Sequence, residues 1–165
     1  MGKPTKKPNV AIVTGGNGFI GSHIVDALIE DYKFDEVRII DNLSSDAHEE
    51  FYYNKSLKVM NYKFDIADFN LIRPLFKGVS VVFHLAAESR IQPAIQNPTL
   101  ATRTNVTGTC NVLQAAREAG CDRVIYSSTS SAYGLKNTPP LKETMPNDCL
   151  NPYSFTTIAD KLALT

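Results

Sequence analysis

The chain has 165 residues, of which 43% are hydrophobic and 21% are charged, the ordinary balance of a soluble globular domain. Its 17 basic residues equal its 17 acidic ones, so no excess charge points to a nucleic-acid partner or an anionic membrane surface. No apolar run approaches the roughly 18 residues that cross a bilayer, and the hydrophobic content is too high for a disordered chain. The length predicts one domain with a substantial core.

The cysteines and the N-terminus are uninformative about chemistry but bear on location. Cys110, Cys121 and Cys149 form neither a disulfide framework nor a metal-binding motif, so we expect reduced thiols in a cytoplasmic protein and no metal site. Residues 1–9 hold three lysines and two prolines without an apolar segment, which predicts a disordered basic tail and no secretion signal. The folded domain is therefore expected to span residues 10–165.

The first half of the chain alternates between short apolar runs and helical spacing. Residues 10–13 are continuously apolar and end close to glycine, which predicts a strand buried on both faces. Apolar residues recur at helical spacing over residues 19–30, which predicts a helix. Strands are predicted at residues 37–40 and 57–64, with a polar loop or short helix over residues 43–56.

The second half repeats the same rhythm. Asp68 is a suitable N-cap for a short helix to Lys77 that Pro74 shortens or kinks. The remaining predicted elements are a strand at 79–85, a helix at 98–119 closed by Gly120, a strand at 123–127 and a helix from about residue 152. This alternation predicts an α/β fold, a doubly wound parallel sheet with helices on both faces and right-handed crossovers.

Three glycines spaced three apart, Gly15, Gly18 and Gly21, lie between the first strand and the first helix. In a dinucleotide site the first glycine allows the tight turn, the second lets a pyrophosphate approach the backbone, and the third allows close helix–sheet packing. The free N–H groups at the start of the helix then face the phosphates. The position of this triplet therefore predicts a dinucleotide-binding loop.

An acidic residue is expected at the end of the second strand of such a site, and Asp41 stands there. Its carboxylate accepts hydrogen bonds from the adenosine ribose and repels a 2′-phosphate, which favours NAD over NADP. A Walker-type phosphate loop is excluded because Ser22 and His23, rather than a lysine, follow Gly21. The remaining alternative is that the glycines only form a tight turn.

Taken together, residues 10–165 resemble the extended short-chain dehydrogenase/reductase family, especially its nucleotide-sugar epimerases and dehydratases and most closely the UDP-sugar 4-epimerases. The motifs are the loop 14–21, Asp41-Asn42-Leu43, Asp65-Ile66, His84-Leu85-Ala86-Ala87, Asn105, the segment 127–134 and Asn151-Pro152-Tyr153. The resemblance implies a Rossmann fold and NAD. It assigns the cofactor to Gly15, Gly18, Phe19, Ile20, Gly21, Asp41, Asn42, Asp65, Ile66, Leu85, Ala86, Ala87, Asn105 and Tyr153.

The same resemblance implies transient oxidation of a nucleotide sugar at its C4. Tyr153 acts there as the base toward a sugar hydroxyl, and Thr129 hydrogen-bonds the same oxygen. Ser89, Arg90 and Ser130 are candidate substrate contacts, although the loop from Ser89 to Pro98 is equally well explained by packing on the next helix. Taken singly, Thr129 is also explained as a loop hydroxyl and Tyr153 as a half-buried aromatic.

Two departures from the family pattern predict weak activity or none. Thr157 stands where the family has a lysine whose charge promotes ionisation of the tyrosine and binds the nicotinamide ribose. Lys161 lies one turn further on the same helix face, where a solvated surface lysine is the better interpretation.

The second departure is length, because the chain stops inside the helix that Tyr153 begins and lacks most of the smaller substrate domain. An uncovered sheet edge would expose apolar surface and favour self-association into homo-oligomers. Two further hypotheses therefore stand beside the enzyme: a non-catalytic dinucleotide-binding module, or a half-subunit that a partner chain completes.

Overall fold

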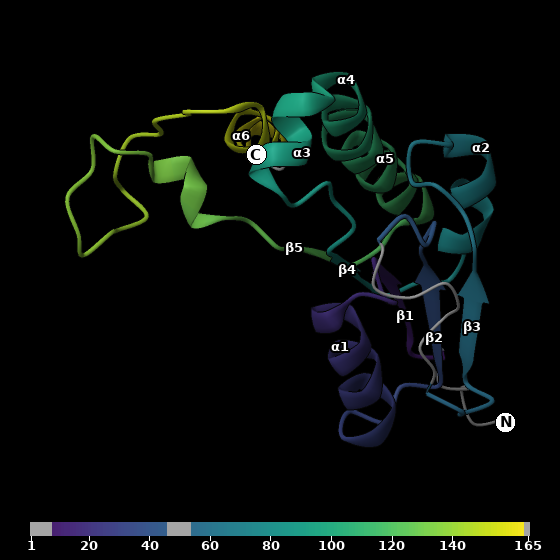
Figure 1. Cartoon of the computed structure of the whole chain (residues 1–165). Coiled ribbons are helices and arrows are strands. Elements are labelled where there is room, and N and C mark those ends of the chain that lie inside the picture. The colour runs from purple at the N-terminus through teal and green to yellow at the C-terminus, as the bar shows by residue number, and fades with distance from the viewer. Residues whose placement is uncertain (1–7, 46–53, 164–165) are drawn as a thin grey trace, which may run out of the picture.

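The computed structural model describes residues 8–45 and 54–163. In that part of the chain the strands β1 (Val10–Thr14), β2 (Glu36–Ile40), β3 (Val59–Tyr62), β4 (Val81–His84) and β5 (Arg123–Tyr126) form one parallel sheet. Their order is β3-β2-β1-β4-β5, so the predicted doubly wound fold is confirmed (Figure 1). The expected tail falls mainly on residues 1–7, and most of the expected loop at 43–56 falls on 46–53; both segments lie outside the described residues.

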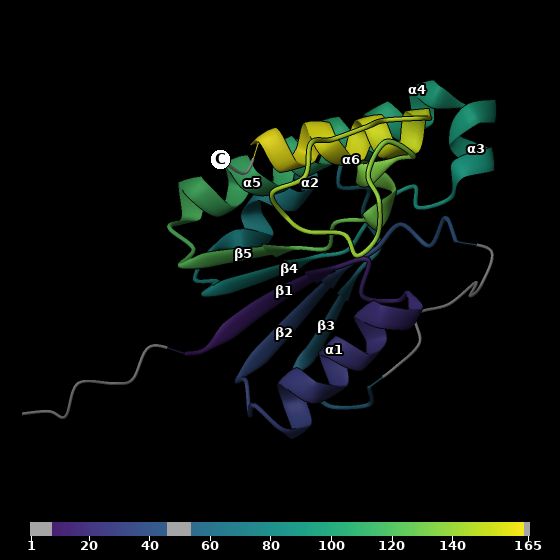
Figure 2. The same cartoon turned by 90° about the vertical axis from the view of Figure 1, so that its left-hand side faces the viewer.

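Helices cover both faces of the sheet. Helix α1 (Phe19–Glu30) lies on one face, and α2 (Phe69–Ile72), α5 (Thr109–Ala119) and α6 (Pro152–Ala163) lie on the other (Figure 2). None of the helices in the described ranges is long and apolar enough to cross a bilayer. Because all five strands are parallel, their carboxyl ends lie at one edge of the sheet, where ligands of such folds bind.

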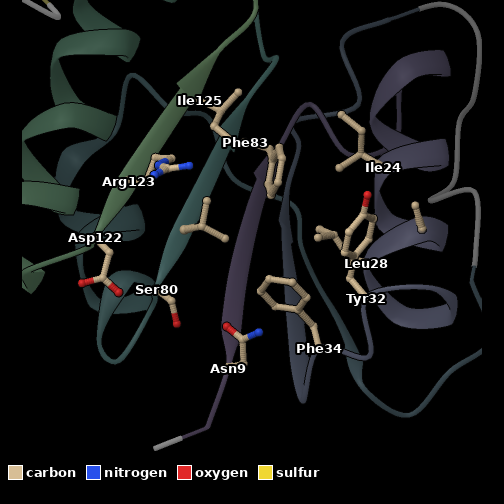
Figure 3. A pocket seen from close by; sticks show the side chains of 12 residues that line it. Asn9, Ile24, Leu28, Tyr32, Phe34, Ser80, Phe83, Asp122, Arg123 and Ile125 are labelled. Carbon is tan, nitrogen blue, oxygen red and sulfur yellow. The ribbon is translucent and has the colours of Figure 1, made fainter.

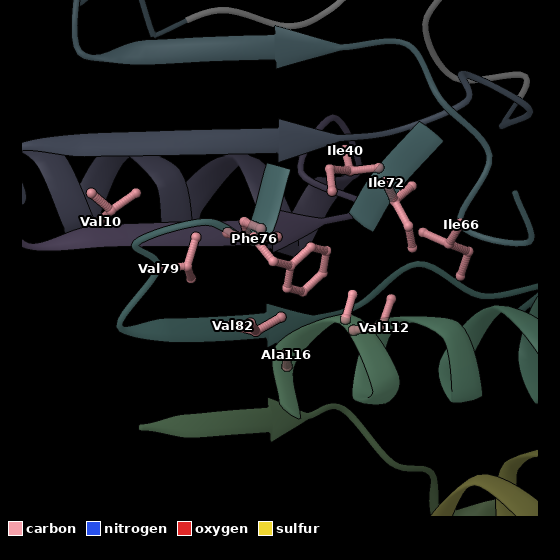
Figure 4. Packing of buried hydrophobic residues seen from close by; sticks show 11 residues of the cluster. Val10, Ile40, Ile66, Ile72, Phe76, Val79, Val82, Val112 and Ala116 are labelled. Carbon is pink, nitrogen blue, oxygen red and sulfur yellow. The ribbon is translucent and has the colours of Figure 1, made fainter. Parts of the chain in front are cut away.

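The sheet divides the core into two layers, and β1 contributes side chains to both. Phe76 and Val112 belong to a cluster on the α5 side (Figure 4), to which Ile12 also contributes. Val13 contributes to a second cluster on the α1 side with Leu28. Ile12 and Val13 are both fully buried, because successive strand side chains point to opposite faces and both faces are covered. This explains why β1 is a continuous apolar run and not an alternating one.

The helical region from residue 98 to residue 119 is confirmed, but it is not uniform. It consists of α4 (Pro98–Ala101), a π-helical stretch η2 (Thr102–Gly108) and α5. It ends at Gly120, whose φ of +68° is the left-handed conformation that glycine adopts at a helix C-terminus. A π-helical stretch changes which residues share a helix face and often marks a functional site.

The chain departs from the predicted elements in several places, among them residues 91–96, β3, and β4, which is shorter than the predicted strand at 79–85. Residues 91–96 form a helix, α3 (Ile91–Gln96), where a loop was expected. Pro93 is tolerated because it lies in the first turn, where a backbone N–H has no partner within the helix. Strand β3 is shorter than predicted, since Leu57 is 99% exposed and precedes the sheet.

The short helix after Asp68 is divided as Pro74 suggested. Helix α2 is followed by a 3-10 turn, η1 (Arg73–Phe76), that has Pro74 near its start, and a second 3-10 turn, η3 (Ser130–Tyr133), follows β5. The backbone carbonyl of Asp68 accepts the N–H groups of Leu71 and Ile72, while its side chain makes no capping hydrogen bond. The helix start was therefore correctly located, but the capping side chain was not used.

Candidate dinucleotide-binding site

The loop between β1 and α1 packs too tightly for side chains at two of its glycines. Gly15 has a φ of +68°, and a Cβ there would lie 2.8 Å from the backbone nitrogen of Ala86. A Cβ at Gly21 would collide with the carbonyl oxygen of Gly15 and lie 2.7 Å from the Cα of Gly16. The loop, the helix start and the end of β4 are therefore in direct backbone contact, as the tight turn and the close helix–sheet packing of such a loop require.

Helix α1 starts at this loop without a capping side chain. The N-cap residue is Gly18, which has no side chain to accept the N–H groups of the first turn. Phe19 and Ile20, the first two helical residues, are 82% and 57% exposed. The twelve-residue helix thus presents its positive dipole end and free N–H groups to an anion.

Asp41 lies beside this loop at the carboxyl end of β2. One carboxylate oxygen accepts the N–H of Asn17 at 2.9 Å and the other accepts the N–H of Leu43 at 2.9 Å. Leu43 has a φ of +59°, so the chain turns sharply directly after the carboxylate. These hydrogen bonds hold the carboxylate in one orientation, with its remaining lone pairs available to a ligand's hydroxyl groups.

A pocket of about 490 Å³ opens at this edge of the sheet and brings most of the predicted residues together. Its lining includes Gly15, Gly18, Phe19, Ile20, Gly21, Asp41, Asn42, Ile66, Leu85, Ala86, Ala87, Ser89 and Tyr153. Sequence reasoning did not assign a ligand contact to the further lining residues Asn17, Ile40, Leu43, Ser44, Ser45, Phe64, Thr104, Ser127 and Ser128. The pocket thus joins segments that are up to 138 positions apart, from Gly15 to Tyr153.

Five predicted site residues do not line this pocket: Asp65, Arg90, Asn105, Thr129 and Ser130. Asn105 is 1% exposed, and its side chain is engaged within the protein. Its Oδ1 accepts the N–H of Glu88 at 2.8 Å, and its Nδ2 donates to the carbonyl of Glu88 at 3.2 Å and to the hydroxyl of Thr156 at 2.9 Å. Asn105 therefore ties the chain after β4 to α6, while its neighbour Thr104 lines the pocket.

His84, the last residue of β4, supports the pocket from beneath. Its Nδ1 lies 2.6 Å from Oγ1 of Thr14, and its Nε2 lies 2.9 Å from Oγ1 of Thr109. Thr14 Oγ1 also accepts the N–H groups of Leu85 at 3.2 Å and Ala86 at 3.3 Å, so its own hydrogen is directed to Nδ1. His84 is therefore a neutral imidazole that carries its hydrogen on Nε2, and burial lowers its pKa to about 4.

The predicted catalytic residues occupy different positions relative to the pocket. Tyr153, in the first turn of α6, is part of the lining and is half-buried. Thr129 caps η3, where its Oγ1 accepts the N–H of Ser131 at 3.2 Å. Thr157 is 4% exposed, and its hydroxyl donates to the backbone carbonyl of Tyr153 at 3.0 Å. Lys161 lies in α6, but its side chain is not among the parts of the chain that the structure describes.

A second hollow, of about 540 Å³, lies on the α1 face of the sheet, over β4 and β5 (Figure 3). Its walls are largely apolar, with Phe83, Ile24 and Phe34 among them. It contains none of the predicted site residues, so the candidate dinucleotide site is the pocket at the glycine loop. Across residues 8–45 and 54–163, no three His, Cys, Asp or Glu side chains gather in a way that could hold a metal ion.

The sheet order, the glycine loop and the acid at the end of β2 define a Rossmann-type α/β fold. A family model described as GDP-mannose 4,6 dehydratase matches residues 12–164. The chain belongs to this family of nucleotide-sugar epimerases and dehydratases, within the extended short-chain dehydrogenases/reductases, as its motifs predicted.

Individual relatives agree with this assignment. The chain is 34% identical over 165 residues to a dTDP-D-glucose 4,6-dehydratase of Mus musculus, with 93% of the chain and 44% of the relative covered. A UDP-N-acetylglucosamine 4-epimerase from Methanobrevibacter ruminantium M1, solved with UDP-N-acetylmuramic acid, is 36% identical with a TM-score of 0.85, covering 97% of this chain and 50% of that one.

A second solved structure is a dTDP-glucose 4,6-dehydratase from Streptomyces venezuelae with NAD bound. It is 32% identical with a TM-score of 0.84, covering 93% of this chain and 50% of the other. The chain thus spans about half the length of these relatives, 44% to 50%.

Proposed function

We propose that this chain binds NAD as the dinucleotide-binding part of a nucleotide-sugar epimerase or dehydratase, with a 4-epimerase as the preferred ancestry. The observation that carries the proposal is the Asp41 carboxylate, held by Asn17 and Leu43 beside the glycine loop. A carboxylate in this position suits the adenosine ribose hydroxyls of NAD and repels the 2′-phosphate of NADP. The absence of room for a Cβ at Gly15 and Gly21 fits the tight turn and the close helix packing of a dinucleotide-binding loop.

The chain's own residues would supply binding, orientation and proton movement. NAD, when bound, supplies a hydride acceptor that can later return the hydride. The N-terminus of α1 would hold the pyrophosphate, and Tyr153, which lines the same pocket, would take the proton from the sugar hydroxyl. Thr129 would hydrogen-bond the same oxygen through its hydroxyl hydrogen, since its bond with the N–H of Ser131 uses only a lone pair of Oγ1.

We propose that this activity is weak or absent in the chain as it stands. A lysine four residues after the tyrosine would bring a positive charge to the phenol, whereas Thr157 is neutral and its hydroxyl is bonded to the carbonyl of Tyr153. This bond is the observation that favours the alternative function, a dinucleotide-binding module without turnover. Substrate contacts at Ser89, Arg90 and Ser130 remain part of the enzymatic proposal, with Ser89 in the pocket lining.

Calorimetric titration with NAD and NADP tests the cofactor proposal. We expect micromolar affinity for NAD and at least about tenfold weaker binding of NADP, since a buried hydrogen bond to a charged group contributes about 1.5–3 kcal/mol. Asp41→Asn should remove most of this preference. Asp35→Asn is the matched control, because Asp35 also accepts a backbone N–H, from Asn9 at 2.8 Å, but at the opposite end of β2. Equal binding of both dinucleotides would refute the assignment of Asp41.

Thr157→Lys separates the two functional alternatives. If the missing charge limits catalysis, this variant should bind NAD as the parent chain does and gain epimerisation of a UDP-sugar or turnover of a dTDP-sugar. Thr157→Met, which brings a side chain of similar length without a charge, is the control. Gain of activity in both variants would contradict the proposed role of the charge at position 157.

A further inference from the structure

The segment after β3, residues 64–67, is held in place by the helical region that contains η2. Phe64 and Ile66 both line the cofactor pocket, and Asp65 lies between them. Three residues of one helical face contact this segment: Arg103, Gly108 and Asn111. In a π-helix, where hydrogen bonds join residues five apart, Arg103 and Gly108 fall on the same face.

The Arg103 contact is an ion pair to a carboxylate that is already partly fixed. Nη1 of Arg103 donates to Oδ2 of Asp65 at 2.6 Å, while Oδ1 of Asp65 accepts the N–H of Ala67 at 2.8 Å. The Asp65 side chain is 27% exposed and that of Arg103 is 50% exposed. Each carboxylate oxygen keeps a lone pair, so Asp65 can accept one further hydrogen bond in a set orientation.

The other two contacts fix Ile66. A Cβ at Gly108 would lie 2.6 Å from Cδ1 of Ile66, so the helix approaches this side chain as closely as glycine permits. Nδ2 of Asn111 donates to the carbonyl of Ile66 at 3.0 Å. Ile66 is 4% exposed and belongs to the core, so this pocket wall is rigid.

The family resemblance implies that the pair Asp65-Ile66 receives the adenine of the dinucleotide. We propose that Arg103 is a positioning residue for this contact: it orients the Asp65 carboxylate to accept the adenine 6-amino group beside Ile66. This inference rests on the proposed NAD function. A flat base with one exocyclic N–H donor matches an apolar wall beside a fixed acceptor, because the donor would otherwise lose its hydrogen bond to water. Arg103 thereby contributes to cofactor affinity without touching the reacting atoms.

The test compares NAD with nicotinamide hypoxanthine dinucleotide, in which a carbonyl oxygen replaces the 6-amino group. The parent chain should prefer NAD by about tenfold, since a carboxylate bonds the amino donor and repels the carbonyl. Arg103→Ala should raise the Kd for NAD by about threefold to fivefold, the range expected of a largely exposed ion pair, and leave the Kd for the analogue nearly unchanged. Arg103→Lys should retain part of the preference.

Arg73→Ala is the matched control, because Arg73 forms an ion pair of the same length, 2.6 Å, with Glu118 of α5 and is also exposed. Both alanine variants should melt within about a degree of each other, which excludes a general loss of structure. Equal weakening of both dinucleotides in Arg103→Ala, or an unchanged preference, would overturn the inference while leaving NAD binding intact. A parent chain that binds neither dinucleotide would instead overturn the proposed function, and this inference with it.

Discussion

Acidification from pH 7.5 to pH 5 should destabilise this protein through His84. The imidazole is 1% exposed and is locked as the neutral form between Thr14 and Thr109. Protonation would place a second hydrogen on Nδ1, opposite the hydroxyl hydrogen of Thr14, and leave a charge in the core. The folded state therefore resists protonation, and burial lowers the pKa of His84 to about 4.

The sign and size of the effect follow from linkage between protonation and folding. Above pH 6.5, the ordinary pKa, His84 is neutral in both states and its contribution is complete. As the pH falls from 6.5 towards 4, the unfolded state takes up the proton and the folded state does not. The free energy of unfolding then drops by about 1.4 kcal/mol per pH unit, which amounts to about 2 kcal/mol between pH 7.5 and pH 5.

Urea denaturation at pH 7.5, 6.0 and 5.0 measures this loss, and His84→Gln isolates it. Glutamine does not titrate, so the variant should be less stable at pH 7.5 but lose about 2 kcal/mol less on acidification. His23→Gln is the control, because His23 is exposed on α1 and should leave the pH dependence of the parent chain unchanged. If the parent and His84→Gln lose the same stability between pH 7.5 and pH 5, the neutral, buried imidazole is refuted.

Three further predictions follow from the glycine loop, the hydrogen bonds of Asn105 and the apolar hollow. Gly21→Ala forces the glycine loop away from its backbone contacts and should raise the Kd for NAD more than about tenfold in calorimetry, with a loss of about 1–3 kcal/mol in urea unfolding; near-parent affinity would contradict the close approach. Asn105→Ala leaves the backbone groups of Glu88 and the hydroxyl of Thr156 without their partner and should lower the free energy of unfolding by about 2–3 kcal/mol, a loss under about 0.5 kcal/mol being the contrary result. We propose that the apolar hollow on β5 is the contact of the expected self-association, so Ile125→Lys, which adds a charge there, should reduce light scattering by oligomers, whereas Leu57→Lys, at a residue that is 99% exposed outside this hollow, should not; equal effects would exclude the hollow as the contact.

The sequence by itself determined the parts of the fold that depend on neighbouring residues. The strand Val10–Thr14, the helix Phe19–Glu30 and the turn between them follow from a continuous apolar run, helical spacing and glycine. Asp41 was located in the same way, because the end of β2 is marked by a change from apolar to polar residues. The family assignment rested on such local motifs in their order along the chain.

Only the tertiary structure decided how distant residues share their hydrogen bonds. Asn105 carries no local sign that its amide is bonded to Glu88 and Thr156, the latter 51 positions away. Nor does the chain's pattern show the π-helical stretch 102–108, since π-helical and α-helical segments have the same composition. A buried donor or acceptor bonds to the partner that packing places beside it, and packing joins elements that are remote in sequence. The ion pair of Arg103 with Asp65, across 38 positions, belongs to this second group.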